Sequence, residues 1–177
     1  MKHRFIILLL SAVCCLPSLF TGCGETTPKD LPKLFPVKLT FTQDGKPLTG
    51  AMVSLQSKDE SVQYGSGGLT DAGGTVILQT HGKYAGVPKG TYTISLSKTE
   101  SVRTGPWDQI PKEEAAGLTF IEQNRSKLKQ EEFHVIPPKY RTADTSDFTL
   151  SVEGKTDKTF DVPAFREKVS ESELRGN

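Results

Sequence analysis

The fold of this chain is decided by residues 37–55, which read VKLTFTQDGKPLTGAMVSL. Apolar and polar residues alternate from Val37 to Thr42, and the alternation returns from Ala51 to Leu55. A period of two is typical of a β-strand with one buried face. The Asp44–Gly45 pair between the two runs favours a turn. The segment therefore predicts two strands separated by a turn.

The same pattern continues along the chain. Short alternating or apolar runs recur between Gly- and Pro-containing turns, at 75–80, 92–97, 148–152 and 160–162. Short strands separated by such turns predict an all-β fold, an antiparallel β-sandwich. Asp71 precedes one of these runs, and we expect its side-chain oxygen to cap its own turn rather than to bind calcium.

Residues 100–135 interrupt the strand pattern. Pro111 can open a helix, and Glu113 and Glu114 suit its positive N-terminal end. We therefore predict a short helical insertion near 108–131. Its apolar residues are expected to share one face: Leu118, Ile121 and Leu128.

The N-terminus has the features of an export signal. Lys2 and Arg4 precede an apolar run from Phe5 to Val13, and Thr21-Gly22 precede Cys23. This arrangement resembles a bacterial lipoprotein signal, in which the cysteine receives the lipid. The apolar run is shorter than the roughly 20 residues that a membrane-spanning helix needs. The resemblance implies a membrane anchor through an N-terminal diacylglycerol (palmitate-type acyl chains) on Cys23, on the periplasmic or surface side.

These features predict four segments. Residues 1–22 form the signal, 23–36 a Pro-rich tether, 37–163 the β-sandwich and 164–177 a flexible tail. The charged tail has little to bury, so we expect it to be disordered or a frayed helix.

Composition excludes several classes of function. Removal of 1–22 takes Lys2 and Arg4 away, so the 22 basic side chains fall to 20, against 21 acidic ones. This balance offers no electrostatic reason to expect nucleic acid. Cys14 and Cys15 leave with the signal, and Cys23 is then the one remaining thiol. We therefore expect no disulfide, no thiolate metal site and no cofactor.

Several motifs together resemble carboxypeptidase regulatory-like domains. Residues 44–53 (DGKPLTGAMV), 70–74 (TDAGG) and 88–94 (PKGTYTI) follow that family's order of turns and strands. Residues 136–140 (IPPKY) and 145–146 (TS) resemble a signature of small exported lipoproteins that carry this domain. The resemblance covers 37–98 and 136–162 and implies a transthyretin-like sandwich of about seven strands. It also implies a non-catalytic spacer, assembly or binding module.

Two enzyme families share the transthyretin-like fold, the hydroxyisourate hydrolases and the intradiol dioxygenases. His81 and His134 lie in neither family's motif, and Tyr140-Arg141 only partly resembles the hydrolase terminus. A hydrolase would gather His81, His134 and Arg141 in one pocket. We therefore expect no enzyme, and a structural or interaction module at the cell envelope.

A binding role is the alternative. Trp107 is the single tryptophan, and in a loop it would suit a glycan or an envelope protein. Tyr140 is a second candidate contact. We favour the other interpretation of Trp107, in which it packs under the insertion as a lid over a sheet edge.

Overall fold

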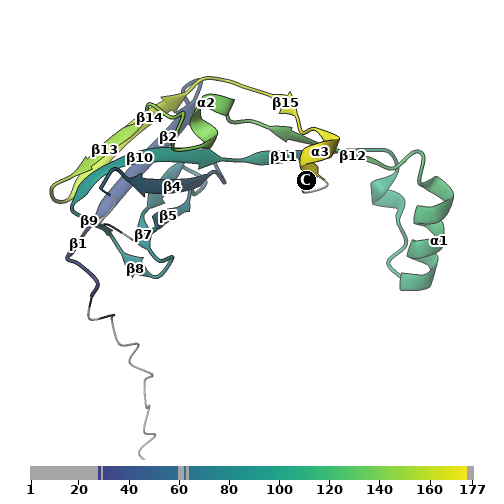
Figure 1. The fold of residues 1–177 in the computed structure, drawn as a ribbon. Coiled ribbons are helices and arrows are strands. Elements are labelled where there is room, and N and C mark those ends of the chain that lie inside the picture. Colours follow the sequence, from purple (N-terminus) through teal and green to yellow (C-terminus); the bar gives the residue numbers. More distant parts are fainter. Residues whose placement is uncertain (1–27, 29, 60–61, 63, 175–177) are drawn as a thin grey trace, which may run out of the picture. The chain divides into compact units, whose positions relative to one another are not determined.

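The computed structural model describes residues 28, 30–59, 62 and 64–174 (Figure 1). Strands dominate these residues, and most neighbouring strands run antiparallel. The prediction of an all-β sandwich is therefore confirmed. No helix in the described part of the chain is long and apolar enough to cross a membrane.

The larger sheet has six strands, of which the longest is β10 (Gly90–Ser97), next to the edge strand. Tyr92, Ile94 and Leu96 of β10 are buried, as their alternation predicts. Across the sheet the order is β13 (Thr149–Val152), β10, β4 (Met52–Ser57), β5 (Ser66–Leu69), β7 (Gln79–Thr80) and β8 (Tyr84–Ala85).

The second sheet is built on β2 (Val37–Gln43), which pairs with β3 (Lys46–Pro47), β6 (Thr75–Ile77) and β14 (Thr156–Val162). The β14–β2 pair is parallel, unlike the other strand pairs and unlike the antiparallel arrangement predicted. Parallel neighbours need a long crossover, and here most of the domain lies between the two strands. Asp44 and Gly45 form the β2–β3 turn with positive φ of 49° and 71°, as tight hairpin turns require.

The apolar core consists of the inward side chains of both sheets. Phe41 stacks on Phe160, Phe160 contacts Phe148, and Phe148 stacks on Tyr140 of helix α2 (Pro138–Arg141). Tyr92 donates a hydrogen bond of 2.8 Å to the Pro88 carbonyl, and burial raises the pKa of its phenol.

The Asp71 turn forms as predicted. Oδ1 of Asp71 accepts hydrogen bonds from the backbone N–H groups of Gly73 (2.8 Å) and Thr75 (2.9 Å). Capping its own turn satisfies this carboxylate.

The insertion is a β-ribbon that carries a helix. Strands β11 (Thr99–Thr104) and β12 (Lys129–His134) pair antiparallel, with a 3-10 turn (Trp107–Gln109) and helix α1 (Glu114–Asn124) between them. The helix is confirmed, but the shared buried face is not. Leu118 and Ile121 are 63% and 39% exposed. The helix packs through Gly117 instead, where a Cβ would lie 2.9 Å from the Pro111 carbonyl oxygen.

Short strands at both ends of the domain lie where the sequence predicted none. β1 (Leu34–Phe35), within the predicted tether, pairs with β9 (Val87–Pro88). β15 (Glu167–Lys168), within the predicted flexible tail, pairs with β12 and leads to α3 (Glu171–Leu174). Each strand has only two residues, too few for an alternating pattern to predict it. Each forms because its backbone pairs with the edge of a neighbouring strand, β9 or β12.

Candidate functional site

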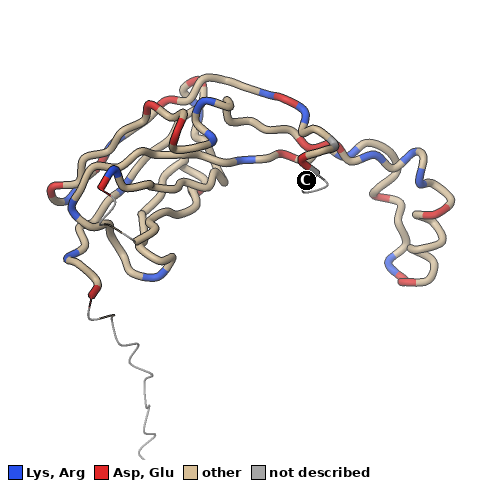
Figure 2. The backbone as a smooth tube through the Cα atoms, in the orientation of Figure 1, with Lys and Arg blue, Asp and Glu red and all other residues tan. Residues whose placement is uncertain are grey.

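The six-stranded sheet contains no charged residue in any of its strands. Charged residues make up 24% of the whole chain, and the strands of the other sheet include Lys38, Lys46, Asp157, Lys158 and Asp161. Figure 2 shows the contrast, because β4 and β5 are tan along their length. Soluble sheets normally place charges on the face that meets water, so this sheet is unusual.

We define the outer face as the side chains of this sheet that point away from the core. The members are small, hydroxyl-bearing, amide-bearing or apolar: Met52, Ser54, Gln56, Gly67, Leu69, Gln79, Ala85, Thr91, Thr93, Ser95, Ser97, Thr149 and Ser151.

Strand register places these residues in rows across the sheet. Ser95 pairs with Ser54, Ser54 with Gly67, Gly67 with Gln79 and Gln79 with Ala85. The row crosses five strands at the usual spacing of about 4.8 Å per strand. The side chains of Ser95, Ser54 and Gln79 therefore form a line of polar groups perpendicular to the strands, interrupted at Gly67, which has no side chain.

An apolar pair lies beside this row. Met52 and Leu69 are cross-strand partners, and they are 49% and 60% exposed. Cross-strand neighbours on one face lie in contact distance, so the two side chains form one apolar patch next to Ser54.

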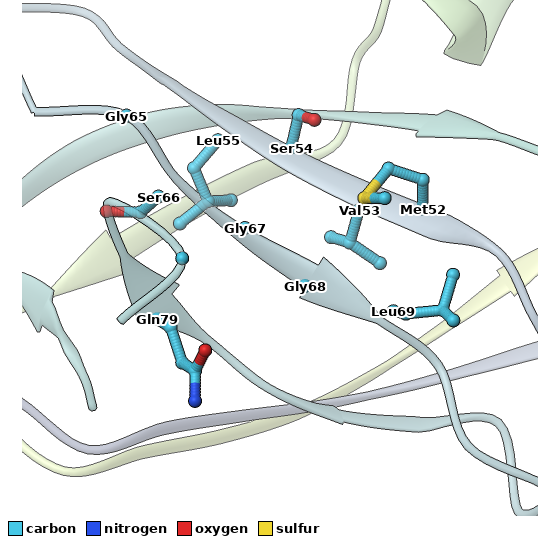
Figure 3. A pocket seen from close by; sticks show the side chains of 11 residues that line it. Met52, Val53, Ser54, Leu55, Gly65, Ser66, Gly67, Gly68, Leu69 and Gln79 are labelled. Atoms are coloured by element: carbon cyan, nitrogen blue, oxygen red, sulfur yellow. The ribbon is translucent and has the colours of Figure 1, made fainter. Parts of the chain in front are cut away.

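Two adjoining hollows indent the outer face. The first, of about 420 Å³, is lined by Met52, Ser54, Gly67, Leu69 and Gln79 among others (Figure 3). The second, of about 360 Å³, shares Ser54, Leu55 and Gly65 with the first and adds Gln56, Ser57, Val62, Tyr64, Ser95 and Ala143. Among the described residues, no charged side chain lines either hollow. Hollows of similar size elsewhere on the described surface are lined by charges such as Lys38 and Asp157, or Glu131 and Lys168.

Glycines of β5 make the first hollow possible. A Cβ at Gly67 would lie 2.4 Å from the Val53 carbonyl oxygen, so β4 and β5 approach too closely there for any side chain. A Cβ at Gly68 would lie 2.7 Å from the Val76 side chain on the core side. The floor of the hollow is therefore bare backbone between Met52, Leu69 and Gln79.

The two described site residues that the sequence predicted, Trp107 and Tyr140, line neither hollow. Cys23 is outside the described residues. Tyr140 stacks on Phe148, with ring centroids 4.4 Å apart, against the core. Trp107 holds the ribbon together, since its Nε1 donates to the carbonyls of Thr104 (3.0 Å) and Lys129 (3.3 Å). These contacts give Trp107 and Tyr140 structural roles.

The residues that a hydrolase would gather make separate contacts. The His81 ring packs edge-on against Tyr64, with centroids 5.3 Å apart. Nε2 of His134 lies 3.5 Å from Oε1 of Glu173, and Arg141 donates to Glu167 at 3.0 Å. The contacts of the described side chains do not join His81 to the other two. Within the described chain there is also no group of three His, Cys, Asp or Glu side chains placed to hold a metal ion.

The outer face escaped prediction although its signal is present in the sequence. Four of its strands lack charged residues in the sequence itself: MVSLQS, SGGL, GTYTISLS and TLSV. The absence of charge becomes a property of one surface only when the strand register places these strands side by side.

Comparisons with known proteins add no family. No family model matches the chain, and no curated protein matches it. Among solved structures, the chain is similar to a 9R-lipoxygenase from Cyanothece PCC8801 at 14% identity. That match covers 79% of this chain and 19% of the lipoxygenase chain, with a TM-score of 0.31. A likeness this low carries no argument about fold or function.

Proposed function

We propose that this chain is an exported, lipid-anchored, non-catalytic interaction module of the cell envelope, and that it contacts its partner through the outer face. The observation that carries the interaction role is the absence of charge from every strand of the six-stranded sheet. A sheet face kept free of charge risks non-specific association. A partner that covers the face accounts for it.

The anchor is supported by the sequence of residues 1–23, where basic, apolar and small residues precede Cys23. Acyl chains contribute about 0.8 kcal/mol per buried CH₂, and two or more chains make attachment stable. The motifs at 44–53, 70–74 and 88–94 support a carboxypeptidase regulatory-like module.

Two measurements test the two parts of the proposal. Mass spectrometry of the N-terminal peptide, with and without globomycin, reports the anchor. A diacylglyceryl mass on Cys23 that the drug prevents is expected, and an unmodified Cys23 contradicts the anchor.

Co-sedimentation with isolated envelopes tests the face. Ser54→Arg places a charge at the centre of the outer face, where Gly67 opposite leaves room for the side chain. Thr159→Arg is the matched control, because Thr159 is exposed on β14 of the other sheet. Both variants keep the lipid anchor, and detergent then extracts the lipid so that only contacts with the partner hold the protein in the pellet. Thr159→Arg should still co-sediment under these conditions, whereas Ser54→Arg should not. Equal retention of both variants contradicts the role of the outer face.

A further inference from the structure

We infer that the outer face binds an uncharged polysaccharide chain, laid across the strands along the row from Ser95 through Ser54 and Gly67 to Gln79. This inference rests on the proposed interaction role of the outer face and names the ligand class.

The lack of charge selects an uncharged ligand. In the part of the chain that the structure describes, side chains that carry charge are absent from both hollows and from the outer face. A charged polymer would lose its hydration there without gaining an ion pair, which is unfavourable. An uncharged polymer meets no such cost.

The hydrogen-bonding groups match sugar hydroxyls. Ser54 and Ser95 each offer one donor and two lone pairs, and Gln79 offers an amide N–H₂ and a carbonyl oxygen. Sugar hydroxyls also donate and accept, so each group can satisfy the other. Ser95 and Ser54 lie one strand apart, at about 4.8 Å, comparable to the length of one pyranose unit in an extended chain. Gln79 lies two strands from Ser54, at about 10 Å, comparable to two such units.

The apolar pair suits the C–H face of a sugar ring. Met52 and Leu69 lie side by side next to the row and are about half exposed. Apolar contact beside a few fixed polar groups is typical of small-molecule sites, and the first hollow of about 420 Å³ falls within their usual range of volumes.

A protein partner fits the face less well. The six strands contain 26 residues; at about 3.3 Å per residue and about 4.8 Å per strand they give a face of roughly 400 Å². A stable protein interface buries about 800 Å² on each partner. The backbone groups of β4, β5 and β10 are also paired within the sheet, so an extended peptide could add a strand only at the sheet's outer edges, β13 or β8, and not over the hollows.

Titration calorimetry of the full chain in detergent tests the inference. The probes are cellohexaose, chitohexaose, maltohexaose and xylohexaose, with heparin as the charged comparison. At least one neutral hexasaccharide should bind with an affinity that does not change with salt. Ser54→Ala and Gln79→Ala should each weaken it about 3- to 10-fold, the loss of one hydrogen bond. Ser54→Arg should abolish binding, and Thr159→Arg should leave it unchanged, with equal thermal unfolding of all variants.

Three results would overturn the inference. One is the absence of binding to every neutral probe. Another is salt-dependent binding of heparin alone. The third is a dimer in sedimentation analysis that Ser54→Arg dissociates, which would make a second copy the occupant. None of these results affects lipid attachment at Cys23 or loss of envelope contacts in Ser54→Arg, so the ligand class and the proposed function fail separately.

Discussion

Thr70 offers a sharp test of how the sandwich is held together. Its side chain is buried, and Oγ1 donates to the Leu48 carbonyl at 2.6 Å while accepting from the Ala51 N–H at 2.8 Å. One hydroxyl therefore satisfies two backbone groups at the junction of β3 and β4. Thr70→Val keeps the shape of the side chain and removes both bonds.

The expected loss of unfolding free energy follows from the two backbone groups that Thr70→Val leaves without a partner, the Leu48 carbonyl and the Ala51 N–H. A buried polar group without a partner costs about 1–3 kcal/mol. The methyl group that replaces the hydroxyl recovers up to about 1 kcal/mol of apolar burial. The two groups together cost about 2–6 kcal/mol, so Thr70→Val should lose about 1–5 kcal/mol once the methyl group is counted. The middle of this range is a large share of the roughly 5–15 kcal/mol that holds a typical domain together.

Urea unfolding of the full chain, followed by circular dichroism, measures this loss. Thr70→Ser is the matched control, because it keeps the hydroxyl and loses one methyl group, at a cost of about 1 kcal/mol. The midpoint should fall much further for Thr70→Val than for Thr70→Ser, with an unchanged slope. If Thr70→Val is as stable as Thr70→Ser, the two hydrogen bonds do not hold the junction.

Two further predictions concern the ribbon. Trp107→Phe removes the indole N–H that donates to the carbonyls of Thr104 and Lys129. Backbone amides at that end of the ribbon should exchange hydrogen about 5- to 10-fold faster, without a change in global unfolding. Unchanged exchange contradicts the role given to the indole. Lys168 donates to Glu131 at 2.7 Å between β15 and β12 and lowers the pKa of that carboxyl below its ordinary 4.5. Because the pKa of Glu131 is lower in the folded state, the ion pair stabilises the fold at pH values above the ordinary pKa of the carboxyl. This stabilisation is lost as the pH falls through the folded-state pKa. Exchange protection of the β15 amides, corrected for intrinsic rates, should therefore drop in acid, and Lys168→Ala should remove this pH dependence; an identical acid profile in both proteins argues against the pair.

The sequence predicts those strands in which apolar and polar residues alternate over several positions. Val37, Leu39 and Phe41, and then Tyr92 and Ile94, alternate for long enough to identify strands and core, and the structure buries all of them. Asp71 is equally local, because its partners lie two and four residues away.

Features that depend on distant neighbours could not be predicted in the same way. The strands of two residues at Leu34 and Glu167 form because β9 and β12 offer free edges. The parallel pairing of β14 with β2 depends on the path of the whole chain. Leu118 and Ile121 have helical spacing, but the ribbon gives helix α1 no core to pack against.

The candidate site belongs to this second group. Ser54 and Gln79 are ordinary polar residues in the sequence, and only the register through Gly67 joins them in one uncharged row. Residue patterns pointed to Trp107 and Tyr140 because aromatic residues are conspicuous, whereas a surface defined by missing charge has no motif.

Photo-crosslinking in intact producing cells tests the central claim most directly. Benzoylphenylalanine replaces Ser54 on the outer face or Thr159 on the opposite sheet, and illumination joins it to whatever lies against it. The account predicts adducts of higher mass from position 54 and none above background from position 159. Adducts equal at both positions, or absent at 54 while Cys23 is lipidated, would contradict the claim that the charge-free face of the six-stranded sheet meets the partner.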